Sequence, residues 1–76
     1  LIYQINWRQL IIMEINVEKI HVGTKLAKVV YKRQYDNTVN DYADVTVEDE
    51  ENGIFIARNA DGYHKFIPER IVKAFV

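Results

Sequence analysis

The residues best suited to chemistry in this chain are two histidines, His21 and His64, and neither belongs to a set that could catalyse a reaction. Neither is spaced with a cysteine, a serine or another histidine, and the sequence contains no cysteine and no serine. An imidazole therefore lacks the usual nucleophile that it would activate. We expect structural roles for both histidines, no catalytic residue and no enzyme activity.

Oxygen ligands for a metal ion are densest in the segment Asp49–Gly53. This segment lacks the alternating acids and the distal glutamate of a calcium-binding loop. A solvated hairpin turn explains its composition better than a metal site. We therefore expect no bound metal and no cofactor.

Charged residues are segregated along the chain, although the formal net charge is only −1. Between positions 19 and 33 all are basic: Lys19, Lys25, Lys28, Lys32 and Arg33. Between positions 36 and 51 all are acidic: Asp36, Asp41, Asp44, Glu48, Asp49, Glu50 and Glu51. Either a basic strand pairs with an acidic one, so that opposite charges meet across a sheet, or the segregation marks an interaction surface.

The acidic segment predicts a protein-interaction surface, because a face of one sign steers a basic partner toward it. The candidate residues are Tyr35, Asp36, Asp41, Tyr42, Asp44, Glu48 and Glu50. The expected partner is a protein, and in a phage or mobile-element setting it would be a nucleic-acid-binding host enzyme.

Nucleic-acid binding is the alternative, since basic side chains can meet phosphates while tyrosines stack on unpaired bases. Its candidate residues are Lys25, Lys28, Tyr31, Lys32, Arg33, Arg58, Tyr63 and Lys65. The near-neutral charge and the acidic segment weigh against this alternative.

Two tight turns position these side chains. Asn52-Gly53 and Asp61-Gly62 supply the positive φ angles that short hairpins need, and alternating apolar and polar residues flank them. The pattern predicts an antiparallel meander with strands at 43–49, 54–58 and 63–67.

The flanking segments complete an all-β order. Residues 25–33 are rich in β-branched and aromatic side chains, which favours a strand. Residues 34–42 are polar and predict a loop. Pro68-Glu69-Arg70 suits a single 3₁₀ turn, because proline fits a first helical turn, and residues 71–76 predict a last short strand.

This order resembles the SH3-like small barrels, which include SH3, Tudor, KOW and Sm-type domains. The resemblance rests on His21–Leu26, Gly53–Ile56 and Asp61–Ile71 and covers about residues 20–76. It implies a five-stranded antiparallel barrel with a 3₁₀ turn before the last strand. Closure would also remove exposed strand edges.

The resemblance also implies two ligand sites to consider. The proline-rich peptide groove of SH3 domains needs a tryptophan where this chain has Ile54 and Phe55. An aromatic cage for a methylated base, as in Tudor domains, could use Tyr35, Tyr42, Tyr63 and Phe55.

The chain of 76 residues is long enough for one domain, which we place at 13–76. Residues 1–12 form an extension that is either translated upstream sequence, with Met13 as the natural start, or a segment that covers the barrel. Trp7-Arg8 can be encoded by a ribosome-binding sequence, which favours a bacterial or phage gene. The lack of cysteine, of a long apolar run and of a signal-peptide pattern predicts a cytoplasmic protein without a membrane span.

Overall fold

A computed structural model describes residues 13–76, so both interpretations of residues 1–12 lie outside the described part of the chain. The elements are β1 (Glu14–Ile15), η2 (Val17–Lys19), β2 (Lys25–Lys32), β3 (Val39–Glu51), β4 (Ile54–Asn59), β5 (Gly62–Phe66), η3 (Pro68–Arg70) and β6 (Ile71–Phe75). The expected all-β class is confirmed, as are the 3₁₀ turn at Pro68 and the strand that follows it.

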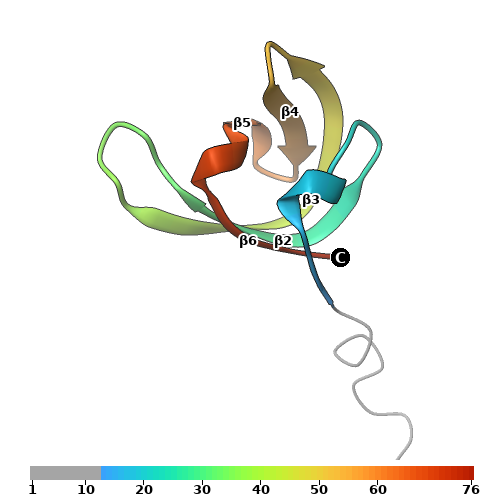
Figure 1. The fold of residues 1–76 in the computed structure, drawn as a ribbon, viewed down its shortest axis with the longest axis horizontal. Helices are drawn as coiled ribbons and strands as arrows, with labels where there is room; N and C mark the ends of the chain where they lie inside the picture. The colour runs from blue at the N-terminus through green and yellow to red at the C-terminus, as the bar shows by residue number, and fades with distance from the viewer. Residues whose placement is uncertain (1–12) are drawn as a thin grey trace, which may run out of the picture.

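One antiparallel sheet contains all six strands in the order β1-β6-β2-β3-β4-β5 (Figure 1). The described sheet thus has six strands rather than the expected five. The additional strand arises because Glu14 and Ile15 pair with Phe75 and Ala74 of β6. The sheet is not closed by strand pairing, since β1 and β5 each have one neighbour.

The first predicted hairpin turn is confirmed, because Asn52 and Gly53 have φ angles of 55° and 80°. The second turn lies one residue earlier than expected. Asn59 pairs with Gly62, so Ala60 and Asp61 form the turn, and of these residues only Gly62 has a positive φ. The reason is local: the Asn59 side chain accepts the N–H of Asp61 and bends the chain there.

The loop between β2 and β3 is shorter than the predicted range of residues 34–42. Strand β3 already begins at Val39, which pairs with Lys32, so Asp41 and Tyr42 lie on a strand. Cross-strand pairing with β2 extends the strand beyond what its polar composition indicates. The remaining loop is closed by backbone hydrogen bonds from Arg33 N to Thr38 O and from Asn37 N to Arg33 O.

A local kink in β3 changes which residues face the core. Tyr42 faces inward before the kink and Val45 and Val47 face inward after it, which a regular alternation would forbid. Asp44 lies between them with φ 53°, a left-handed backbone conformation. The paired strands β2 and β3 curve strongly along their length in Figure 1, and residues on both sides of the kink contribute to the core.

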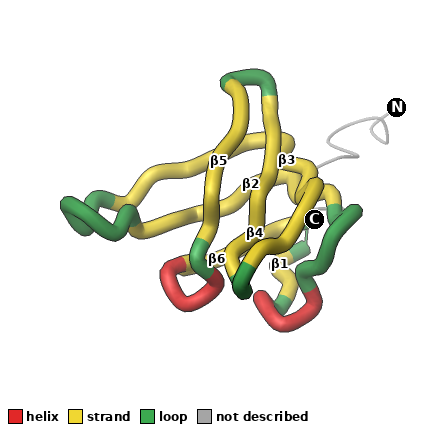
Figure 2. Tube along the Cα trace, turned by 90° about the horizontal axis from the view of Figure 1, so that it is seen from above, coloured by secondary structure: helices red, strands yellow, loops and turns green. Residues whose placement is uncertain are grey.

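The hydrophobic core lies on the concave side of this curved sheet. Its buried members are Ile20, Leu26, Val29, Tyr31, Val45, Val47, Phe55, Ala57, Phe66, Ile71 and Ala74. Figure 2 shows the β2–β3 hairpin extending to one side, beyond strands β4 and β5. The loop of this hairpin therefore stands beside the body of the sheet, where a groove can form.

Candidate ligand-binding groove

A groove of about 450 Å³ lies between the loop that joins β2 to β3 and the strand β5. It is open to solvent and most of its surface is apolar. Its lining residues are Tyr31, Arg33, Gln34, Tyr35, Tyr42, Ile54, His64, Lys65, Phe66 and Ile67. We call it the aromatic groove.

Aromatic rings in edge-to-face contact form its floor. The ring centroids of Tyr31 and Phe66 are 5.0 Å apart, those of Tyr42 and Phe66 are 5.1 Å apart, and those of Tyr42 and His64 are 4.7 Å apart. Such contacts are worth about 0.5–1.5 kcal/mol each beyond the burial of area. The floor is therefore preorganised rather than assembled by a ligand.

His64 is held in this floor by Asn59. Its Nε2 lies 2.8 Å from Asn59 Oδ1, which also accepts the N–H of Asp61 at 2.9 Å. Asn59 Nδ2 donates to the carbonyl oxygen of Ala43 at 3.2 Å. Because an amide oxygen only accepts, His64 Nε2 carries the proton and Nδ1 is left for other contacts. The hydrogen bond to Asn59 thus fixes the position of the His64 ring in the groove floor.

The loop wall of the groove is braced by a compact polar network. Asp36 accepts from Arg33 Nη2 at 2.7 Å, from Thr38 Oγ1 at 2.8 Å and from Thr38 N at 3.1 Å. The hydrogen bond from the backbone of Thr38, followed by those from its hydroxyl and from Arg33, lowers the pKa of Asp36 below its ordinary value. The hydrogen bond to Asp36 raises the pKa of Arg33.

Two further contacts join this network to the groove. The Arg33 guanidinium carbon lies 5.2 Å from the centre of the Tyr35 ring, so the cation supports one face of an exposed aromatic side chain. Arg70, in η3, donates to the carbonyl oxygens of Lys32 and Arg33 at 2.9 and 3.2 Å. The wall is thereby fastened to the turn that follows β5.

The acidic candidates do not form one free surface. Asp36 is bound to Arg33, Asp41 lies 3.4 Å from Lys28, and Glu48 lies 2.9 Å from Arg58. Asp44 and Glu50 make no ion pair with any described residue. The pairs of Asp41 and Glu48 join neighbouring strands, as one of the two interpretations of the charge segregation predicted, whereas Asp36 pairs within its loop. Tyr35 and Tyr42 lie in the groove instead.

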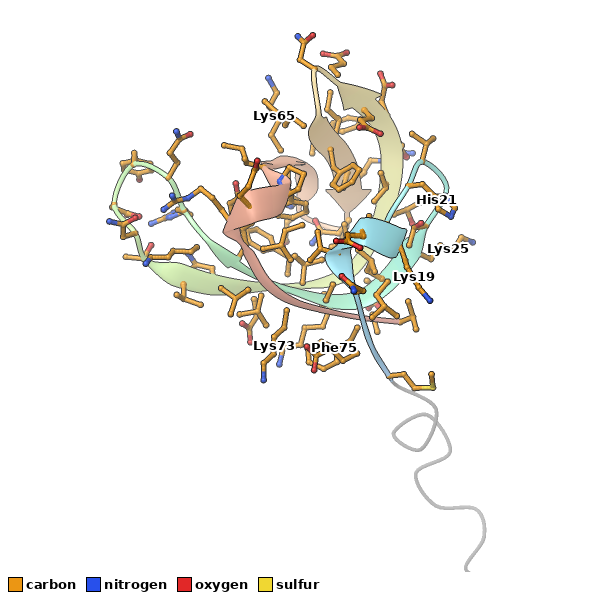
Figure 3. The ribbon with its side chains drawn as sticks, viewed as in Figure 1. Lys19, His21, Lys25, Lys65, Lys73 and Phe75 are labelled. Carbon is orange, nitrogen blue, oxygen red and sulfur yellow. The ribbon has the colours of Figure 1, made fainter. Side chains whose placement is uncertain are left out.

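The basic and aromatic candidates for nucleic-acid binding are dispersed. Tyr31 is 5% exposed, and Arg33, Lys28 and Arg58 are paired with acids. In Figure 3, Lys65 lies at the top of the view, Lys25 at the right and Lys73 below the curved strands, on their convex side. Lys32 is exposed on β2, and Tyr63 is exposed beside Arg58, which lies 5.4 Å from its ring centre. Of these candidates, only Tyr31, Arg33 and Lys65 line the groove.

The proposed four-residue aromatic cage is not assembled. Tyr35 and Tyr42 lie together in the groove, but Tyr63 is exposed and does not line it, and Phe55 is buried in the core. Sequence reasoning missed His64 and Phe66 as groove residues. Strand alternation places the side chains of His64 and Phe66 on one face of β5. Only the folded structure shows that the ring of Tyr31 contacts Phe66 and that the ring of Tyr42 contacts His64.

Within residues 13–76, no three histidine, aspartate or glutamate side chains converge as metal ligands. Over the same residues, no helix has the length and apolar character to cross a membrane. No protein-family model, curated protein or solved structure matches this chain.

Proposed function

We propose that this chain is a non-enzymatic binding module of SH3-like architecture that binds a protein partner through the aromatic groove. The order β6-β2-β3-β4-β5, with the turn η3 between β5 and β6, supports this architecture. Folds of this kind host many functions, so the function is argued from the groove and not from the fold.

The observation that carries the proposal is the chemistry of the groove lining. Its floor is apolar and preorganised, and no aspartate or glutamate lines it. Its rim carries Lys65, which makes no ion pair within residues 13–76, and Arg33, whose charge is paired with Asp36. The Tyr31 hydroxyl accepts the Ile67 N–H at 2.9 Å and keeps its own proton for a ligand. The groove thus combines an apolar floor with the Lys65 ammonium group and has no carboxylate in its lining, which is complementary to an extended peptide segment that carries an apolar and an acidic side chain.

This site replaces the acidic surface as the favoured contact with a protein. Three of its five acids are neutralised by neighbouring bases, and exposed ion pairs of this kind contribute little to binding. Exposed aromatic side chains beside an apolar pocket are the more frequent energetic centres of interfaces. Tyr35, which is 83% exposed at the groove rim, has these properties.

A second candidate function is binding of single-stranded nucleic acid, favoured by the exposed Tyr35 ring beside Arg33 and Lys65. A base could stack on Tyr35 while the cations meet a phosphate. The dispersion of the other lysines and the acids of β3 support the protein partner instead.

The test is selection of 12-residue peptides from a random phage-displayed library against the folded domain, followed by NMR titration and affinity measurement. We expect acidic peptides that shift the amides of Tyr35, Tyr42 and His64. Tyr35→Ala should weaken binding about tenfold, whereas the control variant Asp44→Asn/Glu50→Gln should bind unchanged.

Three results would contradict the proposal. The first is that no peptide is selected. The second is that selected peptides shift residues 44–51 and lose affinity only in the control variant, which would restore the acidic surface. The third is that short single-stranded oligonucleotides shift the groove amides and the peptides do not, with affinity falling steeply as salt rises.

A further inference from the structure

The strand β5 has an open edge beside the aromatic groove. It pairs with β4 along its whole length, from Gly62 opposite Asn59 to Phe66 opposite Phe55, and no described strand pairs with its other side. An open edge presents backbone N–H and C=O groups that can pair with another extended chain. This edge is therefore a possible binding element in addition to the side chains.

The groove follows this edge. Four consecutive residues, from His64 to Ile67, line it. Successive side chains of a strand point to opposite faces, so a groove on one face would be lined by alternate residues. Lining by consecutive residues means that the groove runs along the edge, where the backbone itself is part of its wall.

The direction of one backbone donor shows which groups face the groove. Ile67 continues β5 in an extended conformation, with φ −83° and ψ 120°. Its N–H points to the Tyr31 hydroxyl at 2.9 Å and not to β4. Alternate peptide groups of an extended chain point to the same side, so the N–H groups of Lys65 and Tyr63 face the open edge.

We infer that the aromatic groove binds its ligand by strand addition: an extended acidic peptide pairs with the backbone of β5 around Lys65. Alternate peptide side chains then lie over the floor formed by Tyr42 and His64, and a carboxylate lies near Lys65. This inference rests on the proposed function and adds the mode of binding and the class of peptide. Backbone pairing supplies affinity, and the groove supplies selectivity for alternate side chains.

A peptide fits this edge better than a nucleic acid does. A peptide backbone offers a donor and an acceptor at every second residue, which matches the spacing of the open groups on β5. A phosphodiester backbone has acceptors only. The acid-free lining and the presence of Lys65, which makes no ion pair within residues 13–76, favour an acidic sequence.

The first test is amide hydrogen exchange on the full chain saturated with an acidic 12-residue peptide obtained by the selection described above. Strand addition predicts at least tenfold slower exchange at Lys65 and Tyr63. The same alternation directs the N–H groups of His64 and Phe66 to their β4 partners Ala57 and Phe55, so their exchange should change less. In parallel, N-methylation of single peptide residues should reduce affinity at every second position.

The second test compares Lys65→Pro with Lys65→Ala. Proline removes the outward N–H, and edge strands tolerate proline there because the hairpin does not use that donor. Lys65→Pro should weaken peptide binding more than tenfold, and Lys65→Ala, which removes the charged side chain but keeps the backbone N–H, should weaken it several-fold. Should Lys65→Pro fail to fold, the exchange experiment and the N-methylation series still decide.

The outcomes separate this inference from the proposed function. Groove binding without slower exchange at Lys65 and Tyr63, and without two-residue periodicity, overturns strand addition and leaves the groove as a peptide site. Absence of peptide binding at the groove overturns both. Protection of Lys65 that rises with protein concentration in the absence of peptide identifies a second copy as the occupant. Protection by a single-stranded oligonucleotide alone identifies nucleic acid. Either of these two results overturns the inference.

Discussion

Arg70 Nη2 lies 2.5 Å from Asn37 Oδ1, a contact that joins residues 33 positions apart. Asn37 has φ 60° at the tip of the loop between β2 and β3, and Arg70 lies in η3, directly after the groove strand. The Arg70 guanidinium therefore links the two sides of the aromatic groove. It joins the loop between β2 and β3, which forms one wall, to η3, which follows the wall strand β5. We therefore expect this contact to restrain the loop that forms one wall of the groove.

Arg70→Lys should loosen the loop, because an ammonium group cannot donate to two carbonyl oxygens and an amide oxygen in the same planar arrangement. Hydrogen bonds from charged groups are worth about 1.5–3 kcal/mol, so amide exchange over residues 33–38 should accelerate about tenfold or more. Arg58→Lys, which alters an exposed pair with Glu48, is the matched control and should leave this loop unchanged. Equal exchange rates in both variants would contradict the role of Arg70.

Asn59→Ala should destabilise the fold by about 1–2 kcal/mol, because it removes hydrogen bonds to Ala43, Asp61 and His64. Chemical denaturation measures this change. Asn59→Asp keeps an oxygen for Asp61 and His64 but places it against the carbonyl of Ala43, so it should preserve the Nε2–H tautomer of His64 at reduced stability. Nitrogen NMR of the imidazole reports the tautomer, and an Nδ1–H form in the unaltered protein would refute this arrangement.

Tyr31→Phe should cost about 1–3 kcal/mol of unfolding free energy, since it leaves the part-buried N–H of Ile67 without an acceptor while the ring packing stays intact. Tyr63→Phe removes a hydroxyl from a residue that is 63% exposed and should change stability by less than about 0.5 kcal/mol. Thermal and urea unfolding of the pair gives the comparison. Similar losses in both variants would show that the Tyr31 hydroxyl contributes nothing specific.

Acidification should release the loop network at Asp36. The pKa of this carboxyl is lowered in the folded protein, so its stabilising contribution is complete above the ordinary aspartate pKa, about 3.9, and is lost as the pH falls through the lower folded value. The Thr38 amide shift, followed by NMR, should therefore titrate with a midpoint below about 3.9. This step should be missing in Asp36→Asn. A midpoint at or above the ordinary value would contradict the prediction.

The kink at Asp44 should restrict which residues are tolerated there. A β-branched side chain is strained at φ 53°, so Asp44→Val should destabilise the fold by about 1–2 kcal/mol. Asparagine adopts this conformation readily, and Asp44→Asn should be close to neutral. Denaturation midpoints of the two variants provide the measurement, and an equally stable valine variant would mean that β3 is straight in solution.

Local sequence was sufficient for the turns and for most of the strands. Asn52 and Gly53 were expected to take positive φ angles, and Pro68 was expected to begin a 3₁₀ turn, because both depend on the backbone preferences of the residues themselves. The face shared by His64 and Phe66 followed from strand alternation. The second hairpin turn was placed one residue too late because the Asn59 side chain, rather than the following glycine, begins it.

The groove was not predictable in the same way. Three different strands contribute its aromatic residues Tyr31, Tyr42 and His64. Their contact depends on the register of β2 with β3 and on the kink at Asp44, which changes which side chains of β3 face the core. The charge segregation predicted that basic and acidic strands could pair, but it did not identify Lys28 and Arg58 as the partners of Asp41 and Glu48, because these pairs depend on strand register.

The sequence by itself therefore determined an antiparallel all-β chain with its main turns, because turn and strand preferences act over a few residues. Only the tertiary structure decided which aromatic rings meet, which charges are paired and that β5 keeps an open edge beside the groove. These features depend on strand register and on packing between distant segments, and a shift of one residue would turn every side chain of a strand to the other face.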